Sequence, residues 1–209
     1  MDKRSKVVIF GAGGHGKVVL DILLESGADV LGFIDDDKRK ADHRIRGFSV
    51  FGGWEQIKNK GRIKIALGIG DNVIRGKIFA KAKKAGLKIA CAIHPKAVLS
   101  KDVRVGEGVV IMPGAIINSE AVLEEGVVVN TGSSVDHDCH LKRFSQVWPG
   151  AHLAGAVRVG EFSYVGTGAS VIQNLNIGRH VIIGAGAVII SDVPDNVTMV
   201  GNPGRAVKK

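Results

Sequence analysis

The chain has 209 residues, of which 45% are hydrophobic and only 5% aromatic, so any core consists mainly of Val, Ile, Leu and Ala. This length suits one large or two modest domains, and 29 glycines among dense aliphatic residues indicate frequent turns rather than disorder. The two cysteines have no metal-site spacing, and the sequence shows neither a signal peptide nor an apolar run long enough to cross a bilayer. We therefore expect a cytoplasmic protein without bound metal and without membrane insertion.

The net charge of +9 is concentrated in the first half of the chain. Residues 1–96 contain 20 Lys and Arg against 10 Asp and Glu, whereas residues 97–209 contain 9 against 10. A basic domain attracts nucleic acid, a membrane surface or a phosphorylated ligand, although a solvated Lys-rich surface gives the same balance. Aromatic and basic residues do not interleave and no nucleic-acid motif occurs, so nucleic acid is not expected as a partner.

Apolar runs and amphipathic segments alternate in the first half of the chain. This alternation is typical of a small parallel α/β sheet. The expected strands cover residues 6–10, 30–34, 63–69 and 87–92, and the expected helices run from the glycine motif after the first strand to about residue 26 and over residues 72–84.

A six-residue repeat replaces this pattern after about Pro95. Every sixth residue from 99 to 189 is Val, Ile or Leu, and the residue two positions earlier is small or apolar. The set is Leu99, Val105, Ile111, Ile117, Leu123, Val129, Val135, Leu141, Val147, Leu153, Val159, Val165, Val171, Ile177, Ile183 and Ile189.

A period of six fits a β-helix in which each hexapeptide forms one side of a triangular coil. The repeated aliphatic residue then points toward the axis and stacks on its counterpart 18 residues later, which predicts about five coils. The chain therefore divides into an α/β domain over residues 1–95 and a β-helix over residues 96–209. A β-helix that serves only as a spacer is the alternative to one that carries a site.

The motif G-x-G-x-x-G at Gly11, Gly13 and Gly16 lies between the first strand and the first helix. Glycines let a backbone approach phosphate closely, and a helix N-terminus favours an anion. Asp35 follows Gly16 by 19 residues, where a dinucleotide-binding fold has its ribose-binding acid. NAD is one interpretation, another nucleotide fits the same loop, and a purely structural turn is the third. The second half contains no separate domain for hydride transfer, which weighs against NAD.

The segment Asp136-His137-Asp138-Cys139-His140 lies inside the repeat. Cys139 falls on a small inward position, whereas His137 falls on an outer face or near a corner. Flanking carboxylates hold a histidine in one tautomer and raise its basicity. A histidine between acids is also common on a solvated surface, and position alone favours that interpretation.

Motifs along nearly the whole chain resemble one family. They are GAGGHG, IDDD, GIGDN-IR at residues 68–75, IHP at 93–95, NTGSSVDHDC and the terminal GNPGR. The family comprises bacterial sialic acid O-acetyltransferases and the N-acetyltransferases of the bacillosamine and perosamine pathways, which are hexapeptide-repeat acyltransferases. The resemblance implies an N-terminal Rossmann-like α/β domain followed by a left-handed parallel β-helix. It also implies acetyl-CoA as co-substrate, a nucleotide-sugar substrate from surface polysaccharide biosynthesis, and a homotrimer with active sites between neighbouring β-helices.

The resemblance also assigns residues to roles. His137 matches the general base, and Asp138 matches the acid that raises its basicity. The residues that match the substrate site are Gly11, Gly13, Gly14, His15, Gly16, Asp35, Asp36, Gly70 and Asn130, and those that match the cofactor site are Gln146, Gly155, Thr167 and Ala185. Gln146 departs from the His of some members, and Gly204 departs from the usual Ala of the terminal motif.

The expected reaction is direct transfer of an acetyl group to a sugar amine, without an acyl-enzyme and with His137 as general base. O-acetylation of a sugar of the sialic acid type is the alternative within the class. A sugar-nucleotide sensor without catalytic activity is the alternative outside it. The sequence does not identify the nucleotide or the sugar.

Overall fold

The computed structural model describes residues 6–57 and 63–207. The chain divides into two compact units, Met1–Pro95 and Lys96–Lys209, which are treated separately below.

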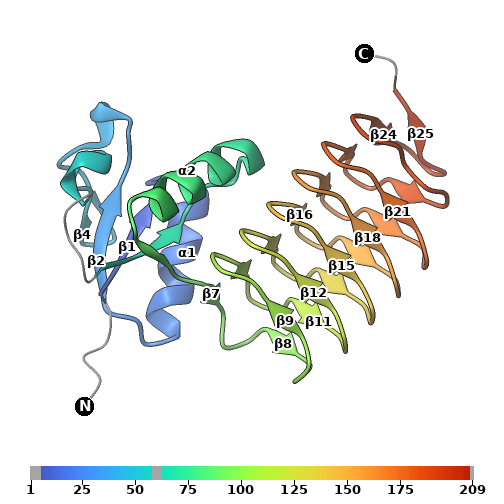
Figure 1. Ribbon diagram of the computed structural model, residues 1–209, viewed down its shortest axis with the longest axis horizontal. Coiled ribbons are helices and arrows are strands. Elements are labelled where there is room, and N and C mark those ends of the chain that lie inside the picture. Colours follow the sequence, from blue (N-terminus) through green and yellow to red (C-terminus); the bar gives the residue numbers. More distant parts are fainter. Residues whose placement is uncertain (1–5, 58–62, 208–209) are drawn as a thin grey trace. The chain divides into compact units, whose positions relative to one another are not determined.

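The N-terminal unit is built on a four-stranded parallel sheet in the order β2-β1-β5-β6 (Figure 1). Helix α1 follows β1 and helix α2 follows β5, so the crossover pattern expected from the sequence is present. The bounds are β1 Lys6–Phe10, α1 Gly14–Glu25, β2 Val30–Ile34, β5 Ile63–Leu67, α2 Asn72–Lys84 and β6 Lys88–Ile89. The expected last strand is shorter than residues 87–92, because a separate strand, β7 Ala92–Ile93, follows after a break.

An irregular segment that the sequence pattern does not predict connects β2 to β5. It contains short 3-10 helices and a small antiparallel hairpin. After the hairpin, residues 51 and 52 form backbone hydrogen bonds with Phe33 and Asp35 at the carboxyl end of β2. Its elements are η1 Lys38–Lys40, β3 Arg44–Ile45, β4 Phe48–Ser49 and η2 Trp54–Gln56.

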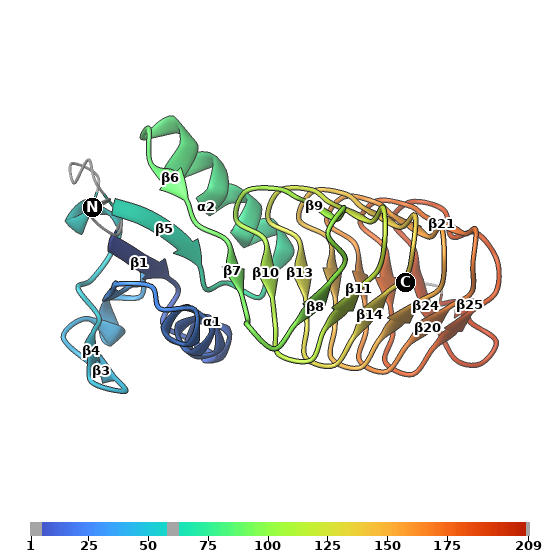
Figure 2. The same ribbon diagram turned by 90° about the horizontal axis from the view of Figure 1, so that it is seen from below.

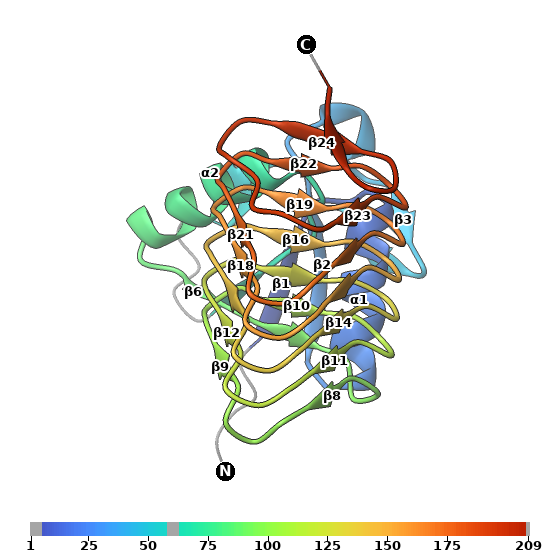
Figure 3. The ribbon, with the colours of Figure 1, turned by 90° about the vertical axis from the view of Figure 1, so that its right-hand side faces the viewer.

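The C-terminal unit is a parallel β-helix whose two-residue strands lie on three faces (Figure 2, Figure 3). Face 1 contains β10 Val110–Ile111, β13 Val128–Val129, β16 Gln146–Val147, β19 Tyr164–Val165, β22 Ile182–Ile183 and β24 Thr198–Val200, which pairs with the antiparallel strand β25 Arg205–Ala206. Face 2 contains β8 Val98–Leu99, β11 Ile116–Ile117, β14 Ser134–Val135, β17 His152–Leu153, β20 Ser170–Val171 and β23 Val188–Ile189. Face 3 contains β9 Arg104–Val105, β12 Val122–Leu123, β15 His140–Leu141, β18 Arg158–Val159 and β21 Asn176–Ile177.

From β8 to β23 the paired strands lie 18 residues apart, as the repeat predicts; Val110, for example, is in register with Val128. At the end of face 1 the separation falls to 16, because β22 pairs with β24 through Ile182 and Thr198. Face 2 has six strands, so the β-helix has about six turns rather than the expected five. The inward aliphatic residues from Ile111 to Ile189 are buried. Leu99 and Val105 are not, and Val105 is 36% exposed, because the first turn has no preceding turn of the β-helix beneath it.

A positive φ recurs every six residues at the second position of each corner. Glycine occupies many of these positions, but Glu120, Asp138 and Ala156 adopt φ of 60° there. Tight turns of type II require φ > 0 at their third residue, and Asp tolerates this conformation better than most residues. The edge between faces 2 and 3 is called corner 2–3. In the turn between β14 and β15, this corner has His137 and Asp138 as its two exposed residues.

Two inward valines differ in burial, so a Val→Ala substitution should lower the free energy of unfolding by different amounts at the two positions. Val165→Ala removes two methyl groups that are 0% exposed, which should lower the free energy of unfolding by about 2 kcal/mol, including the cavity left behind. Val105→Ala at the open first turn should cost less than half as much. Urea unfolding of both variants measures the difference, and equal losses would contradict the role assigned to stacking.

Candidate functional site

Three glycines of the N-terminal unit interlock where β1 and β5 end. A Cβ on Gly16 would lie 1.9 Å from the carbonyl oxygen of Gly11, and a Cβ on Gly68 would lie 2.8 Å from that oxygen. Gly11 also has φ of +108°, a conformation that L side chains rarely adopt. Gly11 and Gly16 are therefore required by the fold itself, whatever the loop binds.

Gly13 and Gly14 differ from these three, because a Cβ at either position would meet nothing within 4 Å. Gly13 is the N-cap of α1 and offers no side-chain cap, so the amides of the first helical turn depend on another partner. The space in front of Gly13 and Gly14 is thus open to a group that accepts hydrogen bonds, and the helix N-terminus favours a negative charge there.

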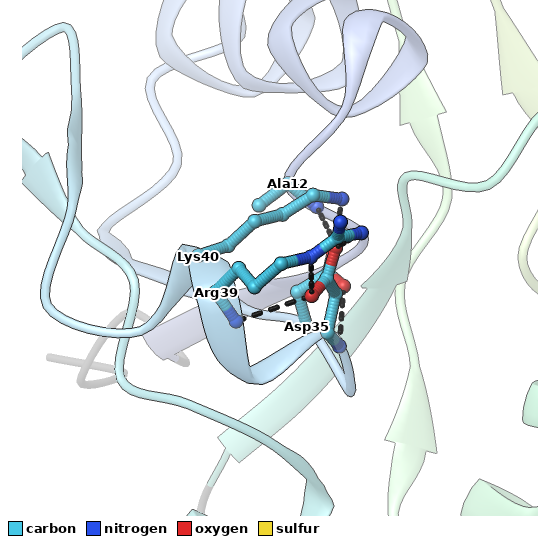
Figure 4. Close-up of polar contacts among 5 residues, drawn as sticks. Ala12, Asp35, Arg39 and Lys40 are labelled. Atoms are coloured by element: carbon cyan, nitrogen blue, oxygen red, sulfur yellow. Dashed lines mark hydrogen bonds and ion pairs between the residues drawn. The ribbon is translucent and has the colours of Figure 1, made fainter.

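Asp35 holds the glycine loop against the segment that follows β2 (Figure 4). Its Oδ2 accepts hydrogen bonds from the Ala12 backbone N–H and from Lys40 Nζ, both at 2.8 Å, and its Oδ1 accepts from the Asp37 N–H at 2.9 Å. Partial burial raises the pKa of Asp35, but the hydrogen bonds from Lys40, Ala12 and Asp37 outweigh it and leave the pKa below its usual value. The Asp35 side chain is only 14% exposed, so most of its hydrogen-bonding capacity is used by other groups of the protein.

Asp36 is the more accessible of the two expected acids. Its side chain is 56% exposed, and its Oδ1 accepts the Trp54 N–H at 3.2 Å. The Lys81 ammonium lies 4.0 Å from Oδ2 and 4.8 Å from the centre of the Trp54 ring. This carboxylate can therefore still accept hydrogen bonds from a ligand.

His15 and Gly70 lie together beside the glycine loop. Burial, with a contribution from the nearby charge of Arg75, lowers the pKa of His15 to about 4, so its imidazole is neutral at physiological pH. Its Nε2 is buried and has no hydrogen-bond partner among the described residues. A buried polar atom of this kind indicates that a ligand or water completes the site.

Arg75, which the sequence interpretation did not single out, fixes the loop that contains Gly70. Its guanidinium is fully buried and donates to the carbonyl oxygens of Ile69 and Gly70 at 3.2 and 3.1 Å, and to Asn72 Oδ1 at 2.8 Å. Burial lowers its pKa to about 10, which leaves it charged at neutral pH.

His137 projects from corner 2–3 of the β-helix. Its side chain is 61% exposed, and its Nδ1 lies 2.7 Å from Asp138 Oδ2. This hydrogen bond, together with the charges of Asp136 and Asp138, raises the pKa of His137 above its usual value. If Nδ1 carries the proton shared with Asp138, Nε2 is left to accept a proton from a bound group.

Gly155 lies directly above His137, 18 residues later in the same register. A Cβ at this position would lie 2.5 Å from His137 Cε1 and 2.6 Å from Nε2, so the imidazole occupies the space that a side chain on residue 155 would need. The Ala156 N–H donates to the His137 carbonyl oxygen at 2.8 Å. Gly155 therefore gives the imidazole the room that any other residue would fill.

The expected cofactor residues share one backbone position, because Gly155, Thr167 and Ala185 each come first in a corner. They are not on the same corner, however. Thr167 and Ala185 stack at corner 1–2, between faces 1 and 2, whereas Gly155 lies with His137 at corner 2–3 on the other edge of face 2.

Asn130 and Gln146 belong to face 1. Asn130 is buried at the end of β13, and its carbonyl oxygen accepts the Ser133 hydroxyl at 2.6 Å. Gln146 is buried in β16, and its Oε1 has no hydrogen-bond partner within residues 6–57 and 63–207. A single chain thus brings His137, Asp138 and Gly155 together, but not with the other residues expected at the cofactor site.

Asn118 and Asp136 complete the surroundings of His137. The sequence interpretation named Asp136 only as one of the two flanking carboxylates and gave Asn118 no role. Asp136 Oδ1 accepts both Asn118 Nδ2 and the His137 N–H, each at 2.8 Å. The 18-residue spacing between Asn118 and Asp136 was the signal that could have identified this pair.

No group of three or more His, Cys, Asp or Glu side chains suited to a metal ion occurs within residues 6–57 and 63–207. Over the same residues, neither helix has the length and apolar character needed to cross a membrane.

Comparison with known proteins finds the same two-part architecture. Residues 6–82 match the family described as the PglD N-terminal domain. The acetyltransferase domain of PglB from Neisseria gonorrhoeae is 39% identical, with a TM-score of 0.91, over 97% of this chain and all of that one, and it has also been solved with acetyl coenzyme A. PerB from Caulobacter crescentus, solved with CoA and GDP-perosamine, is 39% identical, with a TM-score of 0.92, over 97% of both chains.

Curated relatives match over shorter stretches. The UDP-N-acetylbacillosamine N-acetyltransferase of Bacillus subtilis is 36% identical over 111 residues, which are 51% of this chain and 50% of that protein. An uncharacterized mimivirus protein is 31% identical over 102 residues, which are 20% of its length. The chain thus spans half or less of the curated relatives it matches. The expected fold class, a Rossmann-like α/β domain followed by a left-handed parallel β-helix, is confirmed.

Replacing the partner of His137 should change its pKa in a defined direction. Asp138→Asn keeps an oxygen near Nδ1 but removes the negative charge that favours the imidazolium, so the pKa of His137 should fall toward 6.5. NMR titration of the imidazole measures this change. Glu124→Gln, which alters the comparable His140–Glu124 pair on the same β-helix, is the control and should leave the His137 titration in place. An unchanged pKa in Asp138→Asn would contradict the assigned contact.

Proposed function

Because the chain belongs to the family of hexapeptide-repeat acyltransferases that includes the PglB domain and the perosamine and bacillosamine N-acetyltransferases, we propose that it transfers the acetyl group of acetyl-CoA to the amino group of a nucleotide-linked amino-deoxy sugar. PerB binds both CoA and GDP-perosamine, and the Bacillus subtilis relative is named for a UDP-linked amino sugar. The reaction would take place in the cytoplasm, in the synthesis of sugars for surface polysaccharides.

The arrangement of His137, Asp138 and Gly155 is the observation that carries this proposal. An exposed imidazole with one nitrogen held by a carboxylate and a pKa raised from its usual value is suited to general-base catalysis near neutral pH. His137 would remove a proton from the sugar amine as its nitrogen attacks the thioester carbonyl. The tetrahedral intermediate then collapses with cleavage of the C–S bond, and the proton passes from His137 to the departing CoA thiolate.

The backbone N–H of Gly155 is the proposed donor to the oxyanion of that intermediate. Residues that come first in a corner direct their N–H outward: those of His137, Arg143 and Arg179 donate to Asp136, Glu124 and Asp195. Gly155 occupies the same position in its corner, and the imidazole lies against it. A preorganised amide at this place stabilises the developing negative charge.

The N-terminal unit is the proposed binding site for the nucleotide. The open space before Gly13 and Gly14 suits phosphate, and the basic character of residues 1–96 attracts anions. Asp36 has an accessible carboxylate for the base or ribose. NAD is the less favourable ligand, since Asp35, which would bind its adenosine ribose, already accepts three hydrogen bonds from the protein.

A homotrimer is the proposed assembly, because one chain separates residues expected to share a cofactor. Gly155 lies on one edge of face 2, whereas Thr167 and Ala185 lie on the other. Packing corner 2–3 of one chain against corner 1–2 of the next would bring them together. Face 2 also carries exposed aliphatic side chains suited to burial between copies, namely Val98, Ile116, Ile172 and Ile190.

His137→Ala should lower the rate of acetyl transfer by a hundred-fold or more, the order of effect of a general base, because the proton acceptor is lost while the exposed corner stays folded. Release of CoA thiol is measured with acetyl-CoA and a panel of UDP- and GDP-linked amino sugars, free amino sugars and sialic acid.

The panel also separates the alternatives. Thiol release with sialic acid rather than with amino sugars would identify an O-acetyltransferase. Sugar-nucleotide binding without thiol release from any acceptor would indicate a sensor. Calorimetry with NAD is the companion measurement, since tight NAD binding that UDP- and GDP-sugars do not displace would overturn the assignment of the N-terminal unit.

Light scattering should give the mass of three 22.0 kDa chains. Ile116→Lys adds a charge to each copy of face 2 and should weaken this assembly, whereas Val207→Lys, at an exposed position outside face 2, should not. A wild-type protein that is a stable and active monomer would contradict the proposed trimer.

A further inference from the structure

The backbone at His137 is tied to the preceding turn of the β-helix by a shared carboxylate. Asp136 Oδ1 accepts Asn118 Nδ2 from the turn below and the His137 N–H from its own turn, each at 2.8 Å. Asn118 and Asp136 lie 18 residues apart, at the ends of the paired strands β11 and β14, so the register of the β-helix sets their separation. Two donors on one oxygen hold the Asp136 side chain in a single orientation.

This contact matters because the imidazole has few other restraints. The His137 side chain is 61% exposed and is oriented by Asp138 at Nδ1 and by its contact with Gly155 on the next turn. Both restraints act on the ring, whereas Asp136 acts on the peptide from which the ring projects. A rotation of that peptide would move Nε2 away from the amine it must deprotonate.

We propose that Asn118 is a positioning residue for acetyl transfer, which acts through the Asp136 carboxylate to fix the backbone of His137. This inference rests on the proposed function of His137 as general base. Asn118 does not contact the reacting groups; it holds the acceptor of the His137 N–H in place. Misplacement of a reacting group by about 1 Å can cost on the order of a hundred-fold in rate.

Asp136 also contributes its charge to the same site. The hydrogen bonds from Asn118 and from the His137 N–H hold the pKa of Asp136 below its usual value, so it stays ionised at neutral pH. The charged groups that act on His137 are Asp136 and Asp138, and both favour the imidazolium. Two substitutions separate the effect of Asp136 on the backbone position of His137 from the effect of its charge. Asp136→Asn keeps an oxygen acceptor but loses the charge, and Asp136→Ala loses both.

The chain offers a matched control for the Asn118 substitution. Asn176 contacts Asp192 through its backbone N at 2.8 Å and through Nδ2 at 3.4 Å. This second Asn–Asp pair lies on the same β-helix, but neither of its members is next to a histidine in the sequence. Asn176→Ala removes the side-chain contact and keeps the backbone one, so it reports the general cost of losing an Asn side chain that contacts an Asp between turns.

The test compares wild type, Asn118→Ala, Asp136→Asn, Asp136→Ala and Asn176→Ala by steady-state acetyl transfer. Asn118→Ala and Asp136→Ala should lower kcat by about ten-fold or more, while the KM values of acetyl-CoA and of the sugar acceptor change by less than about two-fold, as expected when only the transition state is affected. Asp136→Asn should recover most of kcat. Its acidic limb should move to lower pH, because losing the charge lowers the pKa of His137.

The outcomes separate this inference from the proposed function. A wild type inactive with every acceptor overturns the function. An active wild type together with an Asn118→Ala variant of normal kcat overturns the inference alone. Equal losses of kcat in Asn118→Ala and Asn176→Ala also overturn it, since they would reflect general destabilisation. If Asn118→Ala does not fold, the two Asp136 variants decide: equal kcat in Asp136→Asn and Asp136→Ala would contradict positioning.

Discussion

Stacking of one aliphatic residue on another, 18 residues apart, is the constraint on which the β-helix depends. Each inward side chain must lie over its counterpart, so every side of the triangle has six residues and every corner has the same backbone turn. The turn forces φ of 60° on Asp138 and leaves His137 at the exposed first position of its corner. The positions of His137 and Asp138 are therefore set by the packing of residues inside the β-helix.

The same register also determines which residues distant in the sequence are in contact. Residues 18 apart become neighbours on adjacent turns, which puts Asn118 against Asp136 and the ring of His137 against Gly155. Glycine is used there because the ring occupies the place of a Cβ. In the N-terminal unit Gly11 and Gly16 are needed because two backbone segments cross. Within the motif, Gly13 and Gly14 have open space before them, so the motif combines glycines that the fold requires with glycines that leave room for a ligand.

The six-residue repeat predicted most of the β-helix, whereas the motifs predicted less of the contacts within the sites. The inward residues, their burial and the corner position of His137 follow from the period of six, because that period is a direct consequence of the coil geometry. The contacts of Asp35 did not follow, since Lys40 comes from a short 3-10 helix in a segment without periodicity. The separation of Thr167 from Gly155 could have been predicted from the period. Their proposed joint use of one cofactor could not, because it would depend on a second chain.

The two acids after β2, Asp35 and Asp36, differ in how many hydrogen bonds they accept from the protein. A carboxylate accepts about four hydrogen bonds, and Asp35 already accepts three from the protein, which fixes the glycine loop relative to β2. Such an acid has little capacity left for the two hydroxyls of a ribose. Asp36 is more exposed and accepts one hydrogen bond, from the Trp54 N–H. In the proposed function, recognition of a nucleotide would therefore fall to Asp36 and the open glycines, while Asp35 holds the glycine loop in position.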